Sequence, residues 1–379
     1  MKEHKAATRS LAAITTLRTR KTAFVKSNKG GSVLKKNVDG VVAIPERPRK
    51  ANRHAPPLPL SGLCPSASSL EAQRSIFHEA WWLDIASGGR WALAQVEESG
   101  TIVGEMPYYL PRKGIWQTCI NPPLTRTLGP LILDTQQSPT AEFQHRVSVT
   151  NKLIEQLPRV DKFFQVFDPR IRDAVAFSLN GYNVSLGFTF RISFEQTCED
   201  AWLNIRKYTR NLIEKAEKRL TVGPIYSVDD FLNFYAANLA DRRLRNAYNE
   251  RTMRSLVEAF TDRKAGIILG AYSTTGSLEA AVGLVWDRRT MYYLLTTRAQ
   301  TAHSGSISLL IWKAIQIAIQ RKLILDLDGI ASPTIYRFLS SFGGYLEQRI
   351  EAEKISTGYA LVQTLHRRFF SSTSQGSNI

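Results

Sequence analysis

Apolar and polar residues alternate over several short stretches in the first half of the chain. Arg90–Gln95 and Ile102–Leu110 flank the turn Glu98-Ser99-Gly100-Thr101, which predicts a β-hairpin. An aromatic-rich helix through Phe77 and Ile85 precedes the hairpin. A helix over 141–156 and strands over 163–167 and 182–192 are predicted to follow it.

The second half repeats this order of elements. A charged helix over 200–219 and a helical region over 228–261 precede two strands, 267–272 and 278–286, around a turn at 274–277. The remaining predicted elements are a strand over 291–296, an apolar helix over 307–319, a strand over 323–327, a helix over 333–341 and a strand over 347–352. Placing Gly100 on Gly276 aligns the two halves element by element, which indicates two copies of one unit. The alternative is that hairpins are simply common.

These patterns predict an α/β, mixed α+β protein with two tandem modules, each a mixed central sheet flanked by helices. The first module is expected at 69–198 and the second at 199–370, with a disordered tail at 371–379. Residues 1–68 are polar, basic and interrupted by proline and glycine, so we expect a disordered leader.

Most of the net charge of +17 lies in the first 55 residues. Residues 1–55 hold fourteen Lys or Arg and three acidic residues, which accounts for +11 of it. Basic tails attract polyanions. Phe24 is the only aromatic residue among the leader's charges, so a nucleic-acid partner is disfavoured and a solvated leader is preferred.

Cysteines and apolar runs bear on the compartment. Cys64, Cys119 and Cys198 are few and widely spaced, without metal-ligand or disulfide spacing, which favours buried thiols, no metal and a cytoplasmic location. The N-terminus has no apolar segment followed by a cleavage site, so no secretory signal is expected; an organelle transit peptide is the minority alternative for this basic leader. The apolar helix over 307–319 is too short to span a membrane.

Seven stretches, taken in order, resemble the FemAB-like acyltransferases of the GNAT superfamily. Three lie in the first half: Trp82-Leu83-Asp84, Pro107-Tyr108-Tyr109-Leu110, and Pro122-Pro123-Leu124 with Leu128-Gly129-Pro130. Four lie in the second: the basic run from Arg206 to Lys218, Ser308 to Ile315, Leu325-Asp326-Leu327-Asp328-Gly329, and Phe338 with Phe342-Gly343-Gly344. The resemblance covers roughly residues 70 to 365.

The resemblance implies transfer of an acyl group, acetyl first of all, to an amine of a small molecule, sugar or cell-envelope precursor, including those of exopolysaccharide metabolism. Its donors are acyl-CoA or, in the peptidoglycan branch, aminoacyl-tRNA. That branch often carries a coiled-coil arm, and Asp241–Thr261 is too short for one, so acyl-CoA is preferred. Two alternatives stay open: a tRNA-dependent Fem-type transferase, and a non-catalytic protein that binds polyanions through its leader.

Acyl transfer needs a site for the donor's phosphates, and the loop before the apolar helix is the candidate. Arg298, Ser304, Gly305 and Ser306 are the predicted donor-binding residues, because a helix N-terminus and a close-approaching glycine suit a phosphate. The superfamily's loop has a second glycine, which is missing here. A serine-capped turn without a ligand is the equal alternative.

The candidate catalytic residues lie on two neighbouring strands. Asp326 and Asp328 share one side of a strand end and are candidate general bases or amine-binding carboxylates, unless they only form a turn. Tyr293 is the candidate proton donor to the leaving thiolate, with core packing as its alternative. On the charged helix, Arg206, Lys207 and Arg210 are candidate substrate contacts or a solvated face.

Overall fold

The computed structural model describes residues 69–135, 137–329 and 332–371, and side chains as far as residue 364. The predicted leader at 1–68 and residues 372–379 of the predicted tail lie outside the described residues. The described residues belong to one unit, Ala67–Ile379.

The hydrophobic alternation of the first half forms a run of strands with few helices. The strands are β1 (Trp91–Glu98), β2 (Thr101–Tyr109), β3 (Arg112–Lys113), β4 (Trp116–Ile120), β5 (Leu131–Ile132), β6 (Lys162–Val166) and β7 (Asn183–Ile192). The helices are α2 (Leu70–Gln73), the 3-10 turn η2 (Ile76–His78), α3 (Ala80–Ser87), α4 (Pro139–Glu155) and α5 (Val175–Leu179). The predicted hairpin is confirmed: Ser99 (φ 51°) and Gly100 (φ 78°) form a two-residue turn between β1 and β2.

Among the described residues, the second half contributes more helices than the first. Its strands are β8 (Leu220–Pro224), β9 (Gly266–Ser273), β10 (Leu278–Trp286), β11 (Thr290–Arg298), β12 (Ile324–Gly329) and β13 (Tyr345–Ile355). The helices are α6 (Cys198–Asn204), α7 (Lys207–Glu217), α8 (Val228–Asp241), α9 (Glu250–Asp262), α10 (Ser306–Arg321), α11 (Pro333–Leu339), the 3-10 turn η3 (Ser340–Phe342) and α12 (Thr357–Ser371).

The predicted charged helix over 200–219 is wrong as a single element. The chain breaks at Ile205, which is extended and only 1% exposed, and the Arg206 N–H donates to the Ser341 carbonyl (2.9 Å). Burial of this isoleucine therefore interrupts the helix and makes α7 a separate helix that starts after Arg206.

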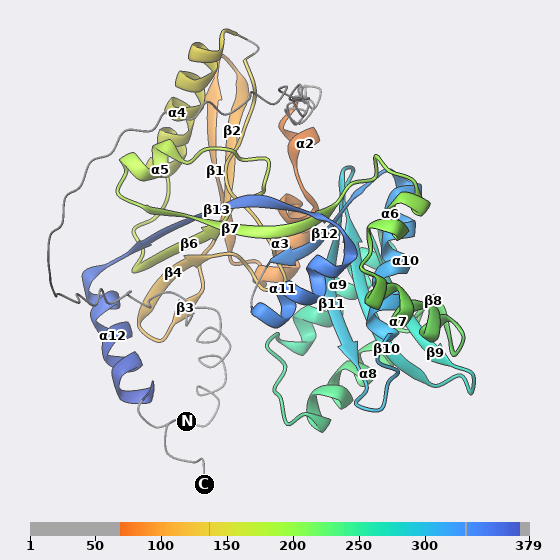
Figure 1. Ribbon diagram of the computed structural model, residues 1–379. Coiled ribbons are helices and arrows are strands. Elements are labelled where there is room, and N and C mark those ends of the chain that lie inside the picture. Colours follow the sequence, from red (N-terminus) through yellow and green to blue (C-terminus); the bar gives the residue numbers. More distant parts are fainter. Residues whose placement is uncertain (1–68, 136, 330–331, 372–379) are drawn as a thin grey trace, which may run out of the picture. The chain divides into compact units, whose positions relative to one another are not determined.

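The strands form one mixed sheet, as the predicted mixed α+β class requires. Its order is β1-β2-β4-β6-β13-β7-β12-β11-β10-β9-β8, with β3 beside β4 and β5 beside β2. The pairs β4–β6 and β11–β12 are parallel, and the other pairs are antiparallel. The long strands β7 and β13 run from one half to the other (Figure 1).

The last strand differs from its expected place. It was expected to complete the second module, but β13 pairs with β6 on one side and β7 on the other, both from the first half. β7 in turn pairs with β12, so the two halves are joined through an exchange of strands. The module boundary between residues 198 and 199 stays a prediction.

Helices cover both faces of the second half of the sheet. Alternate residues of β10 divide between two cores, because strand side chains point to opposite faces in turn. Ala280, Val282 and Leu284 pack with α6, α7 and α10, whereas Ala281 and Val285 pack with α3, α8 and α9. Figure 1 shows α6, α7 and α10 grouped beside these strands. A third core lies in the first half, under α4 and α5.

Candidate functional site

The candidate site lies where β11 and β12 diverge. The two parallel strands pair at Thr290, Met291 and Tyr292 of β11, and their register ends where Tyr292 faces Asp326. β11 then continues to Arg298 and β12 to Gly329 without further pairing between them. We call this region, residues 293–298 and 327–329, the splay. Backbone groups on its inner edges have no strand partner, and side chains bond some of them, among them the Leu294 carbonyl and the Asp328 N–H.

A β-bulge distorts β11 inside the splay. Gly283 of β10 faces Leu295, and the next residue, Leu284, faces Tyr293. Leu294 therefore has no residue opposite it on β10. Bulges redirect backbone and side-chain groups and are common beside active sites.

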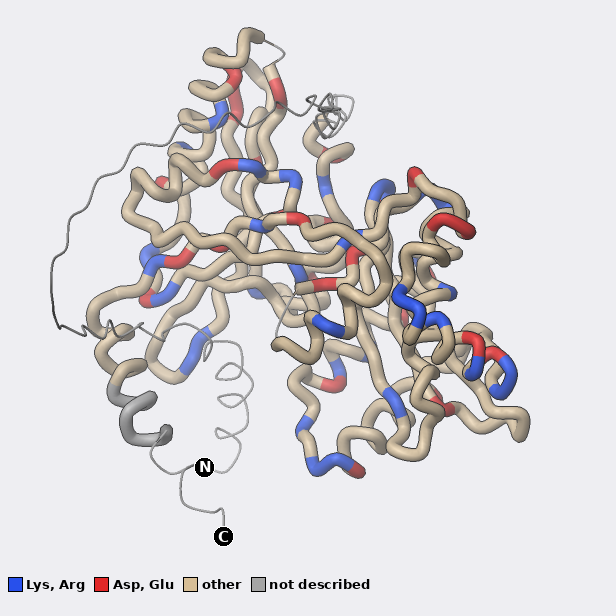
Figure 2. Tube along the Cα trace, in the orientation of Figure 1, with Lys and Arg blue, Asp and Glu red and all other residues tan. Residues whose placement is uncertain are grey.

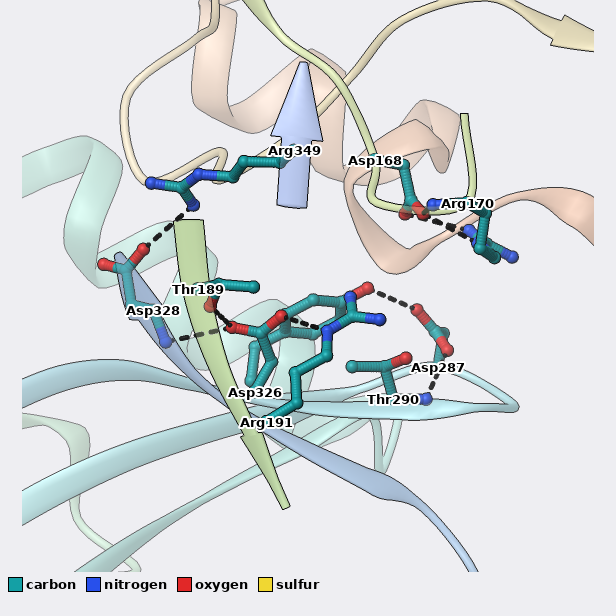
Figure 3. Close-up of polar contacts among 10 residues, drawn as sticks. Asp168, Arg170, Thr189, Arg191, Asp287, Thr290, Asp326, Asp328 and Arg349 are labelled. Carbon is teal, nitrogen blue, oxygen red and sulfur yellow. Dashed lines mark hydrogen bonds and ion pairs between the residues drawn. The ribbon is translucent and has the colours of Figure 1, made fainter. Parts of the chain in front are cut away.

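Three hydrogen bonds hold the Asp326 carboxylate. Its Oδ1 accepts hydrogen bonds from the Thr189 hydroxyl (2.6 Å) and the Asp328 N–H (2.9 Å), and its Oδ2 accepts from Arg191 Nε (2.9 Å). The residue is 6% exposed, and the Arg191 side chain that pairs with it is 7% exposed. These contacts, drawn in Figure 3, suit a structural ion pair between β12 and β7 better than a general base.

Asp328 is more open and meets two arginines. Its Oδ2 lies 2.5 Å from Arg126 Nη1, its Oδ1 lies 3.3 Å from Arg349 Nη1, and its side chain is 24% exposed. The residue has a left-handed backbone (φ 73°), which aspartate tolerates better than most residues. A Cβ on the following Gly329 would meet the Arg349 guanidinium, which would have to shift from its place beside Asp328.

Tyr292 and Tyr293 face opposite sides of β11, as their alternation predicts. Tyr292 is buried in the core with α3, α8 and α9, and its hydroxyl donates to Asp287 (3.2 Å). Tyr293 is half-buried and packs on the α10 side. Burial raises the pKa of Tyr293 to about 12, although the nearby Arg126 acts to lower it. A phenol with this pKa can donate a hydrogen bond to a leaving thiolate but does not readily give up its proton.

The loop before α10 is not the open phosphate loop that was expected. A Cβ on Gly305 would collide with the carbonyl oxygen of Leu212, so this glycine lets α7 approach closely. Ser306 is fully buried and its hydroxyl has no hydrogen-bond partner, whereas Ser304 is exposed. Arg298, at the end of β11, is half-buried, and its carbonyl accepts from Arg242.

Beside this loop the structure forms a basic pocket of about 340 Å³, lined by Lys215, Lys218, Arg219 and His303. His303 Nδ1 accepts from the Gly305 N–H (3.1 Å), which leaves Nε2 to carry the ring proton. The His303 backbone N–H donates to Glu279 (2.7 Å), so hydrogen bonds hold both the backbone and the ring of His303. Three cations and one N–H donor suit a phosphate or pyrophosphate.

The predicted substrate contacts on α7 lie along the same helix. Arg206 and Lys207 are exposed at its start, and Arg210 is half-buried with its guanidinium near the Leu203 carbonyl (3.4 Å). Acidic and basic residues alternate along this helix (Figure 2). The structure therefore brings neither Arg206 nor Lys207 to the splay. The sequence did not single out Arg126, Arg191 or Arg349; only the position of Arg126 after a proline-rich run was a signal.

A second buried polar cluster lies on the α3 side of the sheet. Asp168 is 1% exposed and is paired with Arg170 (2.8 Å); burial acts to raise the pKa of Asp168, but Arg170 outweighs it and lowers that pKa. Asp287 accepts from the backbone N–H groups of Arg289 (2.8 Å) and Thr290 (2.9 Å), and burial raises its pKa. Figure 3 shows both carboxylates next to the Arg191–Asp326 pair.

Comparison with known proteins identifies a domain in the second half of the chain. Residues 203–333 match the model of the acetyltransferase (GNAT) domain. The crystal structure of FemX superposes with a TM-score of 0.58 at 10% identity and covers 76% of this chain and 94% of that chain. Residues 203–333 therefore carry a GNAT domain, and the fold of the described chain is similar to that of FemX. This domain is that of an acyltransferase enzyme.

Two further solved structures are similar to this chain. One is the C-terminal domain of a putative lysylphosphatidylglycerol synthetase from Agrobacterium fabrum, with a TM-score of 0.49, 12% identity, and coverage of 79% of this chain and 91% of that one. The other is a tandem GNAT protein from the clavulanic acid biosynthesis pathway, with a TM-score of 0.44, 13% identity, and coverage of 72% and 93%. Comparison with curated protein sequences finds no match. Among the described residues, no helix has both the length and the apolar character needed to cross a membrane.

Proposed function

We propose that the protein transfers an acyl group, acetyl in the simplest case, from acyl-CoA to an amine of a small molecule, a sugar or a cell-envelope precursor. The observation that carries the choice of donor is the basic pocket of Lys215, Lys218, Arg219 and His303 beside the start of α10. Since Gly305 is packed against α7, these side chains replace the backbone groups of an open phosphate loop.

In the proposed reaction, the acceptor nitrogen attacks the thioester carbonyl within the splay. The new C–N bond forms, the C–S bond breaks, and the thiolate leaves with the bonding electrons. The nitrogen loses one proton as the amide forms, and the thiolate takes up a proton to give the free thiol. Asp328 is the proposed contact for the acceptor amine, because each of its oxygens has a single ion-pair contact and a carboxylate oxygen can accept a second hydrogen bond. Tyr293, on the opposite side, is proposed to donate a hydrogen bond to the thiolate.

Calorimetric titration of the full chain with acetyl-CoA tests the donor. Lys215→Glu and Arg219→Glu are expected to weaken binding by at least about tenfold each, because each removes a charge-assisted contact to phosphate and adds repulsion. Lys113→Glu, at an exposed position of β3, is the matched control and should leave the affinity unchanged. Equal affinities for all four proteins would rule out this pocket as the donor's phosphate site.

An aminoacyl-tRNA donor is the second candidate, favoured by one observation. Arg206 and Lys207 add two exposed cations at the start of α7, the helix whose other end carries Lys215 and Lys218, and cations are what contact a nucleic-acid backbone. Titration with deacylated tRNA separates the two donors. Salt-sensitive tRNA binding that Arg206→Glu weakens, together with no binding of acetyl-CoA, would replace the first proposal by the second.

A further inference from the structure

Arg126 reaches the splay from the other half of the chain. It lies in the loop between β4 and β5, which two hydrogen bonds hold in place. The Trp82 indole N–H donates to the Thr125 hydroxyl (3.0 Å), and Asn121 Oδ1 accepts from the Val166 N–H (3.2 Å). Leu124 and Leu128 of the same loop are buried in the core with α8 and α9. The loop is therefore a rigid support that presents Arg126 to the second half.

The guanidinium of Arg126 joins the two diverging strands. Nη2 donates to the Leu294 carbonyl at the bulge of β11 (2.7 Å), and Nη1 lies 2.5 Å from Asp328 on β12. Burial of Arg126 acts to lower its pKa, but the Asp328 carboxylate outweighs burial and the pKa is raised. The charge is thus held firmly at the place where the strands separate.

The chemistry of this contact requires arginine. A guanidinium is planar and offers five N–H donors in a fixed fork, so one group can bond a carbonyl on one strand and a carboxylate on the next. Lysine has a single ammonium and no such fixed spacing. Arg349 on β13 holds the other oxygen of Asp328, which fixes the carboxylate that Arg126 uses as its anchor.

We propose that Arg126 is a positioning residue for acyl transfer, contributed by the first half of the chain. By tying Leu294 to Asp328, it sets the separation of β11 and β12 and the orientation of the bulge beside which the thioester carbonyl must be held. It enters from the face of α3, α8 and α9, opposite the basic pocket near α10, so it leaves the donor's approach free. The inference rests on the proposed function.

Turnover is measured with acetyl-CoA as donor and glucosamine as acceptor, by release of the free thiol. Arg126→Ala is expected to lower kcat by about 100-fold, since a misplacement of about 1 Å in an active site has that effect. The KM for acetyl-CoA should stay within about threefold, because the phosphate contacts lie elsewhere. Arg126→Lys should recover only a small part of kcat, and Arg159→Ala, at an exposed arginine of the same half, should match the parent.

Chemical rescue separates positioning from a general loss of structure. Millimolar guanidinium is expected to restore kcat of Arg126→Ala, whereas urea, neutral and of the same shape, should not. A kcat of Arg126→Ala within twofold of the parent, or no recovery with guanidinium, would overturn the proposal.

Hydrogen exchange is measured on the ligand-free protein, so this test of Arg126 does not depend on the identity of the acyl donor. Removing the bridge should speed exchange of the β11 amides at 293–297 in Arg126→Ala, and guanidinium should slow it again. Unchanged exchange would show that Arg126 does not hold the splay. If the parent neither binds nor turns over acetyl-CoA while the exchange responds as expected, the proposed donor fails and the positioning role of Arg126 stands.

Discussion

The buried pair of Asp326 and Arg191 offers the sharpest test of how the site is built. Both side chains are at least nine-tenths buried, and they join β12 to β7 across the exchanged strands. Asp326→Asn keeps an oxygen to accept from Thr189 and Asp328 but leaves the Arg191 charge without its main partner. Breaking one side of a buried pair costs about 3–5 kcal/mol. Since Asp168 also lies close enough to Arg191 to raise its pKa, we expect the lower end, about 3 kcal/mol.

The double variant Arg191→Met/Asp326→Asn should recover much of this loss. It removes both charges together, and a buried pair replaced by neutral groups of similar size is often close to neutral in stability. The double variant is therefore expected to be more stable than Asp326→Asn alone, which requires a coupling energy larger than the cost of Arg191→Met by itself. Urea unfolding followed by tryptophan fluorescence measures Asp326→Asn, Arg191→Met and the double variant. Asp262→Asn, at an exposed aspartate of α9, is the control expected within about 0.5 kcal/mol of the parent.

Two results would refute this reasoning. A cost below about 1 kcal/mol for Asp326→Asn, or a double variant no more stable than the single one, would show that the pair does not join the halves. Full stability with complete loss of turnover in Asp326→Asn would instead restore the catalytic role that the sequence suggested for this residue.

Three other predictions follow from the described contacts. Burial lowers the pKa of His78 to about 4, so the folded protein binds fewer protons than the unfolded chain between pH 6.5 and 4. The free energy of unfolding should therefore fall by roughly 3 kcal/mol as the pH drops through this range, and the unfolding midpoint of His78→Gln should vary less with pH. Gly305→Ala should cost about 1–3 kcal/mol and weaken acetyl-CoA binding, because its Cβ would meet the Leu212 carbonyl, whereas Ser304→Ala should do neither. Iodoacetamide followed by peptide mapping should label the exposed Cys198 and spare Cys119, whose pKa burial raises to about 12; labelling of Cys119 in the folded protein would contradict its burial.

The local part of the fold could be predicted from the sequence, because period and turn chemistry are local signals. Alternation and Gly100 predicted the β1–β2 hairpin, and the apolar run that became α10 was placed to within two residues at each end. β4 was missed, since Trp116–Ile120 is a short strand that shows no alternating pattern in its burial. The break between α6 and α7 was missed as well, because Ile205 leaves the helix only to reach a core that distant residues build.

The order of the strands was beyond a local signal. β13 could have paired within its own half, and nothing in Tyr345–Ile355 distinguishes that arrangement from insertion between β6 and β7. The site depends on this choice, because β13 carries Arg349 and β7 carries Arg191, the partners that give Asp328 and Asp326 different roles. The sequence does not distinguish Asp326 from Asp328, and only their different long-range partners give them different roles.

Long-range packing also explains why the candidate donor site consists of side chains and not of the backbone groups expected at Gly305. A glycine before an apolar helix is compatible with a bound phosphate and with a packed neighbour, and the two uses exclude each other when the neighbour's carbonyl fills the space of a Cβ. Here α7 takes that space and brings Lys215, Lys218 and Arg219 to the edge of the loop. Recognition through mobile cationic side chains is more sensitive to salt than recognition through fixed backbone N–H groups. A steep fall of acetyl-CoA affinity with ionic strength is therefore the signature of this arrangement.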